Sequence, residues 1–118
     1  MMVQRGDVVL LRFPFSDGSG SKVRPALIVQ RDADNRRLNS TVVVLITGKT
    51  KLAGREPGHI LIDVESESGK ASGLTMSSVV NVYSLFTLHT NEIRETLGNL
   101  PDDVMSLVDQ QLRLSLDL

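Results

Sequence analysis

The chain has 118 residues and contains no cysteine and no tryptophan. The lack of cysteine excludes disulfides, thiolate zinc sites and cysteine nucleophiles together, so we expect an intracellular, cytoplasmic protein. The first residues lack the apolar run of a signal peptide, and no apolar run approaches the roughly 18 residues that span a bilayer. Hydrophobic residues at 41% and charged residues at 23% are ordinary for a globular domain.

A large excess of charge of one sign is also absent, because the formal net charge is −1. The charges are nevertheless unevenly distributed: bases dominate residues 21–25 and 47–58, whereas acids dominate from residue 101 onward. Two basic loops can bind a polyanion locally, although the same charges also suit solvated loops. The basic residues of these two segments are Lys22, Arg24, Lys49, Lys51 and Arg55.

Internal repeats and low-complexity linkers are missing as well, so we expect a single domain over residues 1–118. Short runs rich in Val, Ile and Leu and bounded by Gly, Pro, Asn, Asp and Ser are typical of β-strands. They cover residues 8–13, 26–30, 41–46, 59–63 and 78–88. The run 41–46 is apolar at nearly every position, which predicts a central strand covered on both faces. The fold class is therefore mainly β, as a small, strongly curved sheet or barrel.

Helical periodicity is confined to the end of the chain. Residues 91–97 are predicted to form about two helical turns, stopped by Gly98. After Pro101, apolar residues recur at the spacing of one face of an amphipathic helix, at Val104, Leu107, Val108 and Leu112. A C-terminal helix is expected to close the barrel, and residues 16–23, 31–40 and 48–58 are expected to be surface loops.

Motifs for metal, nucleotide or triad chemistry are not found. The two histidines, His59 and His89, are far apart in sequence and neither has a partner at metal-ligand spacing. The sequence contains no P-loop, no Gly-x-Ser-x-Gly and no His-Glu-x-x-His motif. We therefore expect neither a bound metal nor a cofactor.

A cation and a hydroxyl stand at two predicted strand ends. Arg24 precedes the strand 26–30, next to the Gly- and Ser-rich segment 16–21, and Thr47 follows the strand 41–46. In an antiparallel barrel such ends can meet on one rim, where an Arg fork and a Thr hydroxyl suit a phosphate. The alternative is that Arg24 pairs with an acid such as Asp17 and that Thr47 merely ends a strand.

A series of short motifs runs through nearly the whole chain. They are Arg5-Gly6-Asp7-Val8-Val9, Pro14-Phe15-x-Asp17-Gly18, Arg24-Pro25-Ala26-Leu27-Ile28-Val29, Leu45-Ile46-Thr47, Gly73-Leu74, Ser78-Val79-Val80, Leu85-Phe86-Thr87-Leu88 and Leu97-Gly98-x-Leu100. In this order they resemble the successive signatures of the MazF/PemK toxin family. No single motif is specific, but the ordered series is.

The resemblance implies an SH3-like barrel of the CcdB/Kid/MazF type that forms a homodimer and is neutralised by a cognate antitoxin protein. It implies a metal-independent endoribonuclease that cuts single-stranded RNA when the ribose 2′-hydroxyl attacks the adjacent phosphate. The products are a cyclic phosphate and a 5′-hydroxyl. In this resemblance Arg24 stabilises the phosphorane and helps to move a proton, and Thr47 orients the phosphate, so these are the predicted catalytic residues.

Other residues complete this prediction or depart from the family pattern. The predicted RNA-binding residues are Lys22, Lys49, Lys51, Arg55 and Phe15, the last as a stacking candidate. Some PemK-type members carry a catalytic arginine where this chain has Phe86, which leaves a second acid or base unassigned; His89 is a candidate substitute. Ser78 matches a family serine and is expected to support a turn.

Two other functions remain open from the sequence. One is a CcdB-like inhibitor that shares the barrel and binds a DNA topoisomerase through its C-terminal residues rather than through Arg24. The other is a barrel of the same descent that has lost catalysis and only binds RNA or a protein.

Overall fold

The computed structural model describes residues 2–14 and 18–118. In this part of the chain the elements follow the order β1 (Asp7–Pro14), β2 (Ser21–Ile28), α1 (Asp32–Asn35), β3 (Ser40–Thr47), η1 (Thr50–Leu52), β4 (His59–Ile62), α2 (Glu67–Ser72), β5 (Ser78–His89), η2 (Thr90–Glu92), β6 (Ile93–Asn99) and α3 (Asp102–Leu116). The predicted fold class, mainly β with a C-terminal helix, is confirmed.

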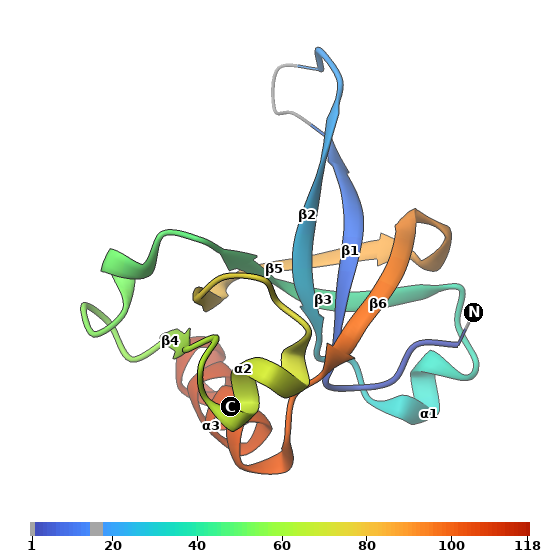
Figure 1. The fold of residues 1–118 in the computed structure, drawn as a ribbon. Coiled ribbons are helices and arrows are strands. Elements are labelled where there is room, and N and C mark those ends of the chain that lie inside the picture. Colours follow the sequence, from blue (N-terminus) through green and yellow to red (C-terminus); the bar gives the residue numbers. More distant parts are fainter. Residues whose placement is uncertain (1, 15–17) are drawn as a thin grey trace.

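The strands of the described part form one antiparallel sheet in the order β4-β5-β3-β2-β1-β6. Figure 1 shows that the sheet is strongly bent: β1 and β2 stand upright as a long hairpin, whereas β3 and β5 run across the body. The predicted central strand is β3. Two consecutive residues of β3, Val43 and Val44, are fully buried and belong to different core clusters. Because successive side chains point to opposite faces of a strand, both faces of β3 are covered.

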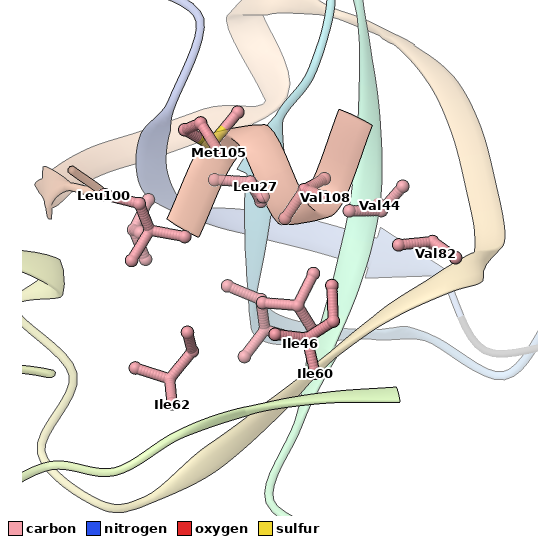
Figure 2. Packing of buried hydrophobic residues seen from close by; sticks show 11 residues of the cluster. Leu27, Val44, Ile46, Ile60, Ile62, Val82, Leu100, Met105 and Val108 are labelled. Carbon is pink, nitrogen blue, oxygen red and sulfur yellow. The ribbon is translucent and has the colours of Figure 1, made fainter. Parts of the chain in front are cut away.

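The larger core cluster lies between the sheet and α3. Figure 2 shows Met105 and Val108 of the helix above aliphatic side chains of the strands. The helix begins after Pro101 and has Asp102 and Asp103 in its first turn, where carboxylates favour the helix dipole. The other face of the sheet carries a second cluster, made by Val3, Val9, Leu11, Ala26, Ile28, Val43 and Ile93.

The sequence pattern places one residue of α3 on the wrong face. Leu107 was expected in the core stripe, yet its side chain is 42% exposed. Met105, which the pattern omits, is buried in its place, and Val104 and Leu112 pack against the cluster. The buried face of α3 is therefore turned about the helix axis by about one residue from the face predicted. Apolar spacing alone does not resolve so small a difference. Among the described residues, no helix is long and apolar enough to cross a membrane.

The helix expected at residues 91–97 is wrong. This segment is the 3-10 turn η2 followed by β6, an edge strand that pairs antiparallel with β1. Ile93 and Leu97 are four residues apart, a spacing that suits a helix face. The three residues between them are exposed, so this edge strand has no apolar alternation to reveal it. Backbone pairing with β1 decides the conformation.

Two expected loops also contain helices. Residues 31–40 include the short helix α1, whose Asn35 is buried and accepts a hydrogen bond from the Thr41 hydroxyl at 2.8 Å. Residues 48–58 include only the 3-10 turn η1. Of the expected loop 16–23, residues 21–23 already belong to β2, and residues 16 and 17 lie outside the described part.

Helix α2 was not predicted, and its ends follow standard capping chemistry. The Ser66 side chain accepts a hydrogen bond from the Gly69 backbone N–H at 3.0 Å, and Gly73 ends the helix with a left-handed φ of 74°. A Cβ on Gly73 would collide with the Leu97 carbonyl, and one on Gly98 with that of Ala71. These glycines allow α2 to lie directly against β6, which brings residues 73–76 to the pocket described next.

Candidate active site

The pairing of β2 with β3 stops part-way along both strands. The last β2–β3 pair, toward the start of β2 and the end of β3, joins Ala26 with Leu45. The residue before Ala26 is Pro25, which has no backbone N–H to donate, and the pairing ends there. Beyond it β2 stays with β1, while β3 stays with β5. A pocket of about 480 Å³ opens between the diverging strands and is also lined by residues 73–76 and by β6.

Arg24 and Thr47 both line this pocket, each two residues beyond the last β2–β3 pair. The structure thus brings the two predicted strand ends to one pocket. Arg24 is half-buried, and its side chain forms no hydrogen bond or ion pair with any residue in the ranges 2–14 and 18–118. None of these residues occupies the guanidinium N–H donors, which can therefore bind a ligand. Asp17, the alternative partner, lies outside the described residues.

Thr47 presents a hydroxyl with a free hydrogen. Its Oγ1 accepts a hydrogen bond from the Lys49 backbone N–H at 3.3 Å, which uses one lone pair. Within the described chain no acceptor takes the hydroxyl hydrogen. Pairing of Thr47 with Val79 of β5 fixes its backbone. The hydroxyl is therefore held in place and can donate to a phosphate oxygen.

Ser78 lies in the same pocket wall but is already engaged. Its hydroxyl donates to the Met76 carbonyl at 2.9 Å, and the residue is 3% exposed. This bond holds the turn before β5, which agrees with the supporting role that the sequence suggested. Apolar side chains of Leu10, Ile46, Leu74, Met76 and Leu97 form much of the remaining lining.

Sequence reasoning missed Glu95, which carries the one carboxylate among the described residues of the pocket lining. The reason is that residues 91–97 were expected to form a helix, which gave no ground for placing Glu95 beside the strand ends. In the observed strand β6, Glu95 and Leu97 are two residues apart and so share one face, and both line the pocket. Lys22 also lines the pocket, so the described lining holds two cations and one carboxylate.

The other predicted binding residues lie outside the pocket. Lys49, Lys51 and Arg55 are exposed on the segment that follows β3, next to the pocket residue Gly48. Phe15 lies outside the described residues, so its predicted stacking role is not located.

Neither histidine belongs to the pocket. His89 pairs with Ser40, at the opposite end of β3 from Thr47, and seven strand steps separate these ends by roughly 20 Å. Its Nδ1 accepts a hydrogen bond from the Asn91 backbone N–H at 3.2 Å. His59 stacks edge-on against Tyr83 with ring centroids 5.4 Å apart. In the described ranges, no three His, Cys, Asp or Glu side chains gather as a metal site would require.

The clearest pKa shift also lies away from the pocket. Side-chain hydrogen bonds from Arg31 and Arg37 lower the pKa of Asp34 to about 2. Asp34 belongs to α1, and Arg31 and Arg37 lie just before and just after this helix, which precedes β3 in the chain. This cluster stabilises the surface there and takes no part in the pocket.

Comparison with known proteins shows the family of this chain. The family model for the PemK-like, MazF-like toxin of type II toxin–antitoxin systems matches residues 4–116. The chain belongs to this toxin family. It is similar to the endoribonuclease MazF2 of Mycobacterium bovis, with 32% identity over 120 residues and the full length of both chains covered.

Solved structures agree with the MazF-type fold. The MazE–MazF crystal structure (Form-III) from Deinococcus radiodurans matches with a TM-score of 0.78 and 24% identity, covering 100% of this chain and 99% of that one. An endoribonuclease in complex with its cognate antitoxin from mycobacterial species matches with a TM-score of 0.72 and 25% identity, covering 98% of this chain and 96% of that one. The bent sheet and C-terminal helix thus form a MazF-type fold.

Proposed function

We propose that this MazF-family protein is a toxin that cleaves single-stranded RNA at the pocket between β2 and β3. The observation that carries the proposal is that Arg24 and Thr47, two side chains with available hydrogen-bond donors, line the same pocket. The name of the M. bovis relative, an endoribonuclease with 32% identity over the whole chain, supports the same activity.

The proposed reaction uses a nucleophile that the substrate brings. The ribose 2′-hydroxyl loses its proton and attacks the adjacent phosphorus, the bond from phosphorus to the 5′-oxygen breaks, and that oxygen takes up a proton. The products are a 2′,3′-cyclic phosphate and a 5′-hydroxyl. Such a reaction needs no cysteine or serine nucleophile and no metal-activated water, so we propose that it is metal-independent.

The protein's contribution is then charge stabilisation and orientation. Arg24 donates to the phosphate oxygens and stabilises the extra negative charge of the phosphorane, which is greatest in the transition state. Thr47 donates its hydroxyl hydrogen to one of the same oxygens and fixes the phosphate. Lys22, on the same wall, adds positive charge that attracts the RNA backbone.

Binding of the flanking RNA is assigned to the exposed bases after β3. Lys49, Lys51 and Arg55 lie on the segment that leaves the pocket at Gly48, so a strand whose phosphate occupies the pocket can continue along them. Phosphate contacts of this kind give affinity without sequence choice. Phe15 is kept as the proposed stacking residue.

Two partners belong to the proposed function. A cognate antitoxin is supported by the match to an endoribonuclease bound to its antitoxin. A homodimer is supported by an apolar face on the other side of the sheet, where Phe86 is 39% exposed and packs edge-on against Phe13 with ring centroids 4.8 Å apart. A pocket of about 540 Å³ beside these rings is large enough to hold side chains from a second copy.

The test is cleavage of a long single-stranded RNA by the purified protein in excess EDTA, with the ends of the products identified. We expect cleavage that persists in EDTA and leaves a cyclic phosphate and a 5′-hydroxyl. Cleavage that EDTA abolishes, or products with a 5′-phosphate, would contradict the proposed chemistry. Growth arrest without RNA cleavage would instead favour the CcdB-like inhibitor, and neither effect would favour an inactive binding barrel.

A further inference from the structure

Glu95 of β6 lines the same pocket as Arg24 of β2, and β1 lies between these two strands. In β1, Leu10 pairs with Pro25 of β2 on one side and with Glu95 of β6 on the other. Glu95 is therefore two strand spacings from Pro25, or roughly 10 Å between backbones. Arg24, the neighbour of Pro25, and Glu95 both line the 480 Å³ pocket. Both residues thus line one pocket, from the two strands that flank β1.

The other polar groups of this lining are poorly suited to accept a proton. Lys22 and Arg24 are cations, and Thr47, Thr75 and Ser78 offer neutral hydroxyls. Lys22 and Arg24 on β2 are also the charged groups that face Glu95 across the pocket. The contributing segments 46–48 and 73–78 contain no charged residue, and Leu10 of β1 is apolar. Glu95 alone among the described lining residues carries a carboxylate, an effective general base.

We infer that Glu95 is a catalytic residue that removes the proton from the attacking 2′-hydroxyl, an inference that rests on the proposed ribonuclease function. The 2′-hydroxyl proton moves to a Glu95 carboxylate oxygen as the 2′-oxygen bonds to phosphorus. The bond from phosphorus to the 5′-oxygen breaks, and the 5′-oxygen takes a proton from water. Glu95 then returns its proton to solvent, so protons balance over the cycle.

The experiment compares the Glu95→Gln variant with the parent in single-turnover cleavage of one RNA across a range of pH. Glu65→Gln is the matched control, because Glu65 is exposed and does not line the pocket. Binding is measured separately with an RNA that carries a 2′-deoxy sugar at the mapped cleavage position. Glu95 is exposed on an edge strand, so the isosteric change should leave thermal unfolding unaltered.

We expect Glu95→Gln to lower the cleavage rate at least about 100-fold, the usual lower range for loss of a general base. The fall in rate on the acid side of the parent's pH profile should disappear in this variant, and the Kd for the deoxy RNA should stay the same or decrease, because a negative charge is lost. Formate should partly restore cleavage by Glu95→Ala, since it replaces the missing carboxylate.

The inference is overturned if Glu95→Gln cleaves at the parent's rate with the same pH profile. It is also overturned if the rate loss is matched by an increase in Kd, which would make Glu95 a binding residue. Both outcomes leave the proposed function intact, because the parent still cleaves RNA. A parent that cleaves no RNA would overturn the proposed function and this inference together.

Discussion

Replacing Thr47 by valine removes one hydroxyl from the pocket while keeping the branched shape that suits a strand. Thr47 is half-buried at the end of β3, and its backbone is held by pairing with Val79. The fold should therefore tolerate the change. The lost bond to Oγ1 comes from the Lys49 N–H, which is exposed and can turn to water instead.

The expected effect follows from the charge of the acceptor. A hydrogen bond to a charged group contributes about 1.5–3 kcal/mol. Because the site is only half-buried, water competes for the phosphate and a value near the middle of this range, about 2 kcal/mol, is appropriate. This corresponds to a loss of roughly 30-fold in kcat/KM for Thr47→Val. Thr47→Ser keeps the hydroxyl and should remain within about threefold of the parent.

The assay is cleavage of an RNA oligonucleotide that contains one mapped site, with substrate well below KM so that the rate reports kcat/KM. Thermal unfolding of each variant checks that the fold is unchanged. If Thr47→Val cleaves as fast as Thr47→Ser, the hydroxyl does not contact the phosphate and the assigned role of Thr47 is wrong.

Two further predictions concern the basic segment and the core. Changing Lys49, Lys51 and Arg55 together to alanine should weaken RNA binding. The slope of log Kd against log salt should fall by about 2, the value for three lost phosphate contacts to single-stranded RNA. An unchanged slope would contradict a phosphate-binding role for these residues. Val108→Ala should lower the free energy of unfolding by about 2 kcal/mol, because it removes two buried methyl-sized groups and leaves a cavity. Leu107→Ala should change this free energy by less than about 0.5 kcal/mol, because Leu107 is exposed. Both values are measured by denaturant titration. Equal costs would contradict the observed rotation of α3.

Burial determines which strands the sequence reveals. Strand β3 is covered on both faces, so its residues form a continuous apolar run and it was predicted within one residue at each end. Strand β6 pairs on one side only and exposes residues 94–96, so its two apolar residues keep a spacing that also fits a helix. The hydrogen bonds that settle its conformation come from β1, which is more than 80 residues away in sequence.

The same distinction applies to the pocket. Arg24 and Thr47 were predictable because each follows from the end of a recognisable strand, and antiparallel pairing brings such ends together. Glu95 was not predictable while its segment was assigned to a helix. Residues 73–76 reach the pocket through α2, whose apolar content is too low to show periodicity. For this helix, the Ser66 cap and Gly73 were the available signals.

The central claim is that Arg24 stabilises the transition state of RNA cleavage, and the most direct test is the rate of Arg24→Ala in excess EDTA. Loss of one preorganised donor to a developing negative charge costs about 2.7 kcal/mol or more, so cleavage should fall at least about 100-fold. Arg36→Ala, which removes an exposed arginine outside the pocket, should cleave like the parent. Cleavage by Arg24→Ala at the parent's rate would contradict the account.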